Sequence, residues 1–294
     1  SDMTKPVIGF IGLGLMGGNM VENLQNKGFD LVVMDLNKDA VARVVARGGS
    51  TASSAKELAA ASDIVMLCLT TSAVVESIVY AEDGILAGIR EGAVLVDFGT
   101  SIPASTRKIG ADLAAKGAGM IDAPLGRTPA HARDGLLNIM AAGDKDTFNK
   151  VKPVLEEQGE NVFYLGALGA GHTTKLINNF MGMTTVATMS QAFAVADLAG
   201  VDRQQLWEIM STGPSMSPFM QFCKNYAVDN VSDLGFSINN ANKDLGYFLE
   251  MVKDLGTVSE IAQGTSSNLQ AAVDAGLGNG NVPEILDYFL KLEK

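Results

Sequence analysis

Residues 7–18 of the chain read VIGFIGLGLMGG, an apolar run followed at once by glycines at the spacing GxGxxG. Directly after a strand and at the start of a helix, this pattern is typical of a dinucleotide-binding turn. Gly12 permits the tight turn, Gly14 lets a pyrophosphate approach the backbone, and Gly17 lets the helix pack closely on the strand. Free N–H groups at the helix terminus then bind the phosphates. The predicted cofactor contacts are Gly12, Leu13, Gly14, Leu15, Met16 and Gly17.

A carboxylate ends the next predicted strand, at the distance expected of a ribose contact. Asp35 follows the glycines by about 20 residues, where it would accept hydrogen bonds from both ribose hydroxyls of NAD. It would repel the 2′-phosphate of NADP, and Lys38 is the only cation close to it in the sequence. We therefore predict NAD as the cofactor. The alternative is that Asp35 only ends the strand or caps the following helix.

Short apolar runs alternate with amphipathic segments through the first half of the chain, which predicts βαβ units and a parallel sheet. We expect strands at residues 7–11, 31–35, 64–69, 94–97 and 120–122, with late strands of the same sheet at 136–142 and 162–165. We expect helices at residues 15–26, 38–46, 55–61, 104–116 and 145–158. The predicted fold class is α/β, with a Rossmann-type, doubly wound and mainly parallel sheet in residues 1–166.

Beyond Gly166 the spacing of apolar residues becomes helical. The stretch from Lys175 to Asp197 carries no formal charge between its ends, so a membrane span has to be considered. Its asparagines, threonines and glutamine are too polar for lipid, and a helix through a protein core fits better. We expect residues 167–294 to form an all-helical domain that serves substrate binding and oligomerisation.

Composition narrows the class of protein. With 47% hydrophobic residues the chain can bury a large core, whereas a net charge of -11 and 6% aromatic residues disfavour a nucleic-acid partner. Cys68 and Cys223 are too few for a disulfide framework, and no residue spacing predicts a metal site. No cationic and apolar leader is visible, so we expect a cytoplasmic protein without membrane association.

A lysine near the start of the long helix is the candidate for proton transfer. Lys175 and Asn179 lie four residues apart, so both side chains share one helical face. An apolar helix and an oxidised, cationic cofactor would both disfavour the ammonium form and lower the pKa of Lys175 toward a useful range. The alternatives are a solvated lysine in the first helical turn and a buried structural amide at Asn179.

The chain resembles the β-hydroxyacid dehydrogenase family over nearly its full length. The matching motifs, in the family's order, are Gly9–Gly18, Asp122–Thr128, Gly169–Asn179 and Lys243–Leu245. The resemblance implies an NAD-dependent oxidoreductase with a Rossmann-type domain followed by an all-helical domain, assembled as a homodimer or homotetramer.

The resemblance also implies roles for individual residues. Lys175 corresponds to the general acid that protonates the substrate oxygen as hydride arrives, and Asn179 to the residue that orients the substrate. Lys243 corresponds to a lysine that reaches the active site and contacts substrate and cofactor, unless it only pairs with Asp244. Thr70 and Thr100 are expected beside the cofactor, Thr100 at the nicotinamide ribose.

One motif departs from the family pattern. Most members carry Ser-Gly-Gly where this chain has Gly126-Arg127-Thr128, and an arginine fork with a hydroxyl can bind a larger tetrahedral oxyanion. The triplet is similar to that of the sulfolactaldehyde reductase branch. This implies reduction of 3-sulfolactaldehyde to 2,3-dihydroxypropane-1-sulfonate, with Arg127, Thr128 and Asn178 addressing the sulfonate.

Several alternatives remain open at this point. If Arg127 pairs with Asp134, a carboxylate substrate stays in place, as in tartronate semialdehyde reductase or 3-hydroxyisobutyrate dehydrogenase. A non-catalytic NAD-responsive module would need the glycines but not Lys175. A relative of 6-phosphogluconate dehydrogenase is a third possibility, disfavoured by the short helical domain. His131 and His172 lie outside any acid–base motif and are expected to be structural, or to support residues of the site without contacting the substrate.

Overall fold

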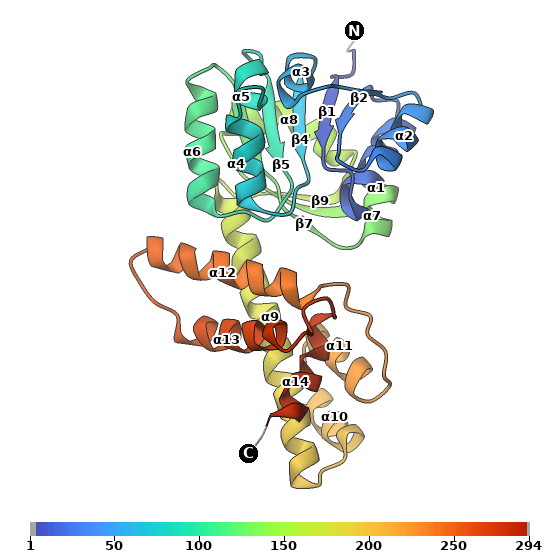
Figure 1. The fold of residues 1–294 in the computed structure, drawn as a ribbon, viewed down its shortest axis with the longest axis vertical. Helices are drawn as coiled ribbons and strands as arrows, with labels where there is room; N and C mark the ends of the chain where they lie inside the picture. The colour runs from blue at the N-terminus through green and yellow to red at the C-terminus, as the bar shows by residue number, and fades with distance from the viewer. Residues whose placement is uncertain (1–3, 293–294) are drawn as a thin grey trace. The chain divides into compact units, whose positions relative to one another are not determined.

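The computed structural model describes residues 4–292. Contacts within the chain divide it into two compact units, Ser1–Lys175 and Leu176–Lys294. The first unit is an α/β domain and the second is helical, which confirms the predicted fold class (Figure 1).

The main sheet of the N-terminal unit has six parallel strands in the order β3-β2-β1-β4-β5-β6. The strands are β1 (Ile8–Ile11), β2 (Leu31–Met34), β3 (Ser50–Thr51), β4 (Ile64–Leu67), β5 (Val94–Asp97) and β6 (Gly119–Asp122). The chain leaves β1 toward β2 on one side and later returns to β4 on the other. Ligands of such sheets bind outside the carboxyl ends of the strands, at this reversal.

Helices cover both faces of the sheet (Figure 1). Alternate strand residues point to opposite faces, so Phe10 and Met66 belong to one apolar cluster, whereas Val65 and Leu95 belong to another. The helices concerned are α1 (Leu15–Asn26), α2 (Lys38–Ala46), α3 (Ala55–Ala60), α4 (Ser72–Tyr80), α5 (Ile85–Gly88) and α6 (Pro103–Ala114). The sequence patterns did not predict the helices α4 and α5.

The late strands form a separate sheet, which corrects the expectation that they extend the main one. This second sheet has the order β7-β8-β9, with β7 and β8 antiparallel and β8 and β9 parallel. A single bridge between Asp122 and Ala142 connects β6 to the end of β8. The elements are β7 (Leu125–Gly126), α7 (Pro129–Asp134), β8 (Leu137–Ala141), α8 (Lys145–Glu156) and β9 (Gly159–Tyr164).

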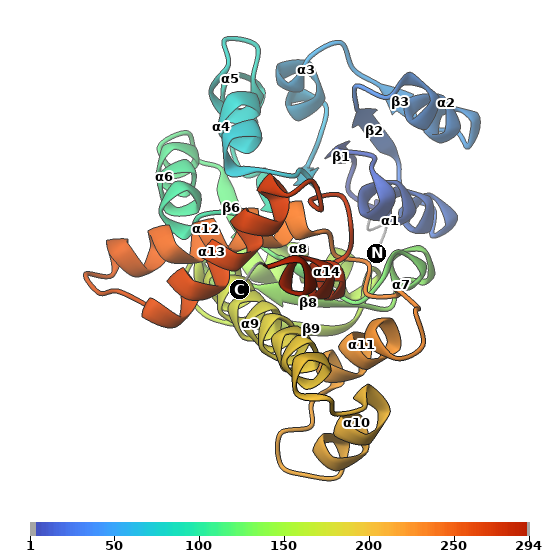
Figure 2. The same ribbon diagram turned by 60° about the horizontal axis from the view of Figure 1, so that its bottom comes forward.

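The C-terminal unit is built around α9 (Ala170–Ala199), whose first residues belong to the N-terminal unit. Leu176, Val186 and Phe193 are fully buried in the core of this unit, as predicted for a core helix. Helices α12 and α13 pack side by side (Figures 1 and 2). The other elements are α10 (Arg203–Ser211), α11 (Pro218–Ala227), α12 (Ile238–Asp254), α13 (Glu260–Asp274), η1 (Val282–Glu284) and α14 (Ile285–Lys291). Within residues 4–292 no helix has the length and apolar character needed to cross a membrane.

Candidate active site

The glycine turn between β1 and α1 has the geometry that a pyrophosphate needs. Gly12 has a φ of 102°, which favours glycine, and a Cβ at Gly17 would overlap the carbonyl oxygen of Gly12. Gly14 differs from both, because a Cβ there would meet no atom within 4 Å. It is the N-cap of α1 and no side chain caps this helix end. The turn therefore leaves open space beside the N–H groups at the start of α1. These residues can accommodate the pyrophosphate of a dinucleotide.

Asp35 connects the glycine turn to the loop after β2. Its Oδ2 accepts a hydrogen bond from the Leu13 N–H (2.6 Å), and its Oδ1 accepts one from the Asn37 N–H (2.7 Å). Asn37, rather than Asp35, caps α2 through its own side chain. A carboxylate has about four lone-pair sites, so two remain for ribose hydroxyls.

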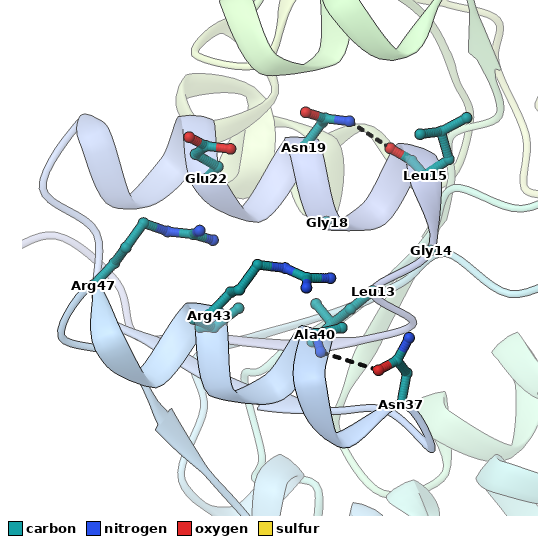
Figure 3. A pocket seen from close by; sticks show the side chains of 11 residues that line it. Leu13, Gly14, Leu15, Gly18, Asn19, Glu22, Asn37, Ala40, Arg43 and Arg47 are labelled. Atoms are coloured by element: carbon teal, nitrogen blue, oxygen red, sulfur yellow. Dashed lines mark hydrogen bonds between the residues drawn. The ribbon is translucent and has the colours of Figure 1, made fainter.

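A cavity of about 380 Å³ adjoins the same turn, between α1 and α2 (Figure 3). Leu13, Gly14 and Asn37 line one end of it, and the side chains of Arg43 and Arg47 lie along it. Lys38 is therefore not the only cation near the glycine turn. The sequence analysis missed these two arginines, which are far from the glycine turn in the sequence: Arg43 lies within α2 and Arg47 is the C-cap of that helix.

The expected cofactor threonines also follow strand ends. Thr70 lies in the loop after β4 and is exposed, and Thr100 lies in the loop after β5 and is half-buried. The strands β2, β1, β4 and β5 are neighbours in the sheet. Asp35, the glycine turn, Thr70 and Thr100 are therefore brought to one edge of the N-terminal unit.

Lys175 reaches back from α9 to the short strand β7. Its Nζ donates a hydrogen bond to the carbonyl oxygen of Leu125 (2.8 Å), the residue before Gly126. Asp122 fixes this end of the helix by accepting hydrogen bonds from the N–H groups of Gly169 (2.9 Å) and His172 (2.8 Å). The structure thus brings the predicted proton donor to the predicted anion-binding triplet.

Within that triplet, Arg127 has an unusual backbone conformation and an ion-pair partner that we did not predict. Its φ of 77° lies in the left-handed region, which a glycine would adopt without strain. Its guanidinium donates to the carbonyl oxygen of Leu136 (2.9 Å) and pairs with the carboxylate of Glu160 on β9. The alternative partner named above, Asp134, pairs with Arg133 instead (3.6 Å). Asp134 was considered as a partner of Arg127 because it is close in the sequence. Glu160 is far away in the sequence, but it lies on β9, which pairs with β8 in the same sheet.

The neighbouring side chains of the triplet are also engaged. Thr128 caps α7, and its hydroxyl lies 2.6 Å from Nδ1 of His131. Arg127 holds the pKa of Glu160 below its ordinary value, mainly through their hydrogen bond. Both members of the ion pair are partly exposed, at 30% and 54% of their side chains, so water screens the attraction and the pair is weak.

In the C-terminal unit, Asn179 and Lys243 meet at one buried carboxylate. The Asn179 side chain donates to Oδ2 of Asp244 (2.8 Å), and Nζ of Lys243 lies 3.4 Å from Oδ1 of the same residue. Asp244 is 3% exposed and Asn179 is 7% exposed, whereas Asn178 is exposed. The pairing of Lys243 with Asp244 was one of the alternatives that the sequence left open.

Sequence reasoning assigned no supporting role to Asp97 or Asp122, and it named Asp244 only as a possible partner of Lys243. Asp97, Asp122 and Asp244 are all buried, and each accepts a hydrogen bond from a residue near a predicted contact. Asp97 and Asp122 end predicted strands, which is a signal that could have found them. No local pattern marks Asp244 as the partner of Asn179.

Two family models cover almost the whole chain. The NAD-binding domain of 6-phosphogluconate dehydrogenase matches residues 7–166, and the NAD-binding domain of NADP-dependent 3-hydroxyisobutyrate dehydrogenase matches residues 169–289. The chain belongs to the β-hydroxyacid dehydrogenase family. It is therefore an oxidoreductase with NAD as its cofactor, which confirms the predicted class and disfavours a non-catalytic binding module.

Named relatives of the family differ in substrate at similar identity. The chain is 30% identical to the 3-sulfolactaldehyde reductase of Escherichia coli (strain K12), covering 95% of this chain and 94% of the relative. It is 34% identical to the NAD-dependent L-serine dehydrogenase of Pseudomonas aeruginosa, covering 89% and 87%. Among solved structures, the 3-hydroxyisobutyrate dehydrogenase of Mycobacterium tuberculosis with L-serine has a TM-score of 0.85 at 25% identity, covering 98% of this chain and 100% of that one.

Proposed function

We propose that the chain reduces a small anionic aldehyde, with 3-sulfolactaldehyde as its substrate and 2,3-dihydroxypropane-1-sulfonate as the product. The glycine turn and Asp35 would hold the reduced form of NAD, which when bound would provide the hydride for the aldehyde carbon. Lys175 gives a proton to the aldehyde oxygen and regains one from solvent. The observation that carries the proposal is the 2.8 Å hydrogen bond from Lys175 Nζ to Leu125, because it puts the amine beside the triplet that addresses the anion.

The left-handed backbone of Arg127 supports a role for its guanidinium in substrate choice. A non-glycine residue in this conformation costs on the order of 1–2 kcal/mol, a strain that a glycine would not bear. Strain of this kind gathers at functional sites. Because the pair with Glu160 is partly exposed and weak, the guanidinium can exchange this carboxylate for a sulfonate. Asn178, exposed on α9, is the proposed third contact.

A carboxylate-bearing substrate is the second candidate, and a specific observation favours it. Both polar side chains of the triplet have partners: Arg127 pairs with Glu160, and Thr128 caps α7 with His131. If these contacts persist with substrate bound, only backbone N–H groups remain to receive the anion. Such a site suits a small carboxylate, as in a tartronate semialdehyde reductase or a 3-hydroxyisobutyrate dehydrogenase.

A substrate panel with two variants separates these candidates. We would measure kcat/KM for 3-sulfolactaldehyde, tartronate semialdehyde and succinic semialdehyde with NADH, and for 3-hydroxyisobutyrate with NAD. Arg127→Gly removes the guanidinium and relieves the backbone strain, so any loss reports on the side chain alone. Glu160→Gln, the matched control, frees the guanidinium and leaves it in place.

We expect the wild type to prefer the sulfonate and Arg127→Gly to reduce kcat/KM for it by about 10- to 100-fold, the range for a hydrogen bond to a charged group. Carboxylate substrates should change by less than about threefold in this variant. Glu160→Gln should keep the sulfonate preference. A wild type that prefers a carboxylate, or an Arg127→Gly variant that loses all substrates equally, contradicts the sulfonate proposal.

A further inference from the structure

A buried cluster of ionisable side chains lies under the candidate site of the N-terminal unit. His172 is fully buried in the first turns of α9, and it faces Asp97 at the end of β5, Asp122 at the end of β6 and Thr106 on α6. Both aspartates and the threonine are at most 1% exposed. The chemistry proposed above uses none of these four side chains. Buried ionisable groups are destabilising unless they are paired, so the contacts among these four side chains have to account for their burial.

The hydrogen bonds of Thr106 leave two arrangements of protons on the His172 ring. If the Thr106 hydroxyl donates to the carbonyl oxygen of Ile102 (3.3 Å), it accepts from Nδ1–H of His172 (2.7 Å). If it donates to Nδ1 instead, the proton of the neutral ring is on Nε2. In both arrangements Nε2 is buried, 3.7 Å from Oδ2 of Asp97, and without a hydrogen-bond partner among the described residues.

In the first arrangement, the charges around Nε2 require one more proton. Asp122 accepts two backbone N–H bonds, from Gly169 and His172. Asp97 accepts one, from Gly99, and burial raises the pKa of Asp97 while His172 opposes that rise. A carboxylate facing the bare lone pair of Nε2 would be repelled. A proton on either Nε2 or Asp97 removes this repulsion.

Other groups near the cluster do not supply that proton. Burial raises the pKa of the Cys68 thiol, which feels the charge of Asp97, to about 12, so this thiol stays neutral. Arg107 on α6 lies over Gly169, at the turn that precedes α9. Among residues 4–292, Asp97 is the acidic residue within 4 Å of Nε2.

The two ends of this contact belong to different parts of the candidate site. Asp97 begins the turn that carries Thr100 and holds it through the N–H of Gly99 (2.9 Å). His172 lies one turn before Lys175 on α9, and its own N–H is held by Asp122. A bond between Nε2 and Asp97 would therefore tie the turn expected at the nicotinamide ribose to the helix end that carries the proton donor.

We propose that His172 is a positioning residue: a proton held between its Nε2 and Asp97 links the Asp97–Thr100 turn to the first turns of α9 and sets the place of the Lys175 amine. This inference rests on the proposed function, because Lys175 is the acid there. His172 itself touches no substrate in this proposal.

Two substitutions test separately the contact of Nδ1 with Thr106 and the contact of Nε2 with Asp97. In His172→Asn the amide nitrogen can replace Nδ1 toward Thr106, but nothing reaches Asp97. In His172→Gln the longer side chain can place its amide nitrogen near the position of Nε2 and donate to Asp97. We expect His172→Asn to lower kcat by about 10- to 100-fold, the effect of misplacing a catalytic group by about 1 Å, with the Kd for NADH within about twofold. His172→Gln should stay within about threefold of the wild-type kcat.

Equal losses of kcat in the two variants, or no loss in His172→Asn, would overturn the inference. A measurement on the wild type covers the case in which a variant does not fold. The chain has two histidines, so the imidazole ¹⁵N resonances are readily assigned by comparison with a His131→Asn variant. We expect the Nε2 resonance of His172 to show the shift of a protonated or strongly hydrogen-bonded nitrogen, and to change when Asp97→Asn removes the carboxylate.

A His172 spectrum that is the same with and without Asp97→Asn contradicts the proton link. This readout needs no substrate, so it is independent of the proposed reaction. A wild type that reduces none of the aldehydes in the panel overturns the proposed function instead.

Discussion

The two units of the chain hold their candidate site residues by different means. In the N-terminal unit, backbone groups position most of these residues. Asp35 and Asp122 accept hydrogen bonds from main-chain N–H groups, and glycines shape the turn after β1. In the C-terminal unit, side chains hold each other, since Asn179 donates to Asp244 and Lys243 pairs with the same carboxylate.

This difference decides which side chains can be changed without disturbing the fold. A carboxylate held by rigid backbone donors keeps its place when a neighbouring side chain is removed. A cluster in which two side chains depend on one buried carboxylate loses its order when that residue changes, because a buried polar group without its partner is costly. Lys175 belongs to the first kind, since its partner is the backbone carbonyl of Leu125.

The largest expected effect comes from the lysine. Lys175→Ala should reduce kcat by about 10²-fold or more, the scale of general acid catalysis, while NADH still binds. Steady-state kinetics and fluorescence titration with NADH would measure the two quantities. Lys150→Ala, at an exposed position on α8, is the control and should change neither. Unchanged turnover in Lys175→Ala would refute its role as the proton donor.

A pair of glycine substitutions separates cofactor binding from folding within the same turn. A Cβ at Gly14 meets open space and its φ of -66° suits any residue, so Gly14→Ala should leave Tm unchanged. The methyl group would occupy the space meant for the pyrophosphate and weaken NADH binding by about tenfold, roughly the loss of one hydrogen bond to a charged group.

Gly17→Ala should behave in the opposite way, because its Cβ overlaps the carbonyl oxygen of Gly12. Overpacking of this kind costs about 1–3 kcal/mol, which corresponds to a Tm lower by several degrees. Thermal unfolding of the two variants without cofactor, and NADH titration of each, give the comparison. An equal fall in Tm for both variants would mean that Gly14 has a structural role as well.

The same difference between the units explains which site residues could be predicted from the sequence and which could not. The glycine turn, Asp35 and the strand ends could be predicted because a parallel sheet brings the ends of its strands to one edge. The partners Glu160 of Arg127 and Asp244 of Asn179 could not, because each is fixed by packing between elements that are far apart in sequence. The separate sheet of β7, β8 and β9 was missed for the same reason, since strand patterns do not specify which strands pair.

The smallest expected effect tests the side-chain cluster of the C-terminal unit. Asp244→Asn keeps an acceptor for Asn179 and removes the charge that pairs with Lys243. We expect a loss of about 1–2 kcal/mol in stability, since a hydrogen bond to a charged group becomes an ordinary one. In the N-terminal unit, by contrast, Lys175→Ala should leave Tm almost unchanged. Thermal unfolding of both variants would compare the two kinds of support.

Asp254→Asn makes the same chemical change at an exposed position of the same helix, and it should not alter Tm. If Asp244→Asn also leaves Tm unchanged, the buried carboxylate contributes no net stability, because its desolvation then offsets its contacts. A fall in kcat/KM in that variant without a fall in Tm would still link Asp244 to the substrate through Asn179. If neither Tm nor kcat/KM changes, the side-chain cluster neither stabilises the C-terminal unit nor positions Asn179. The proposed difference between the two units is then wrong.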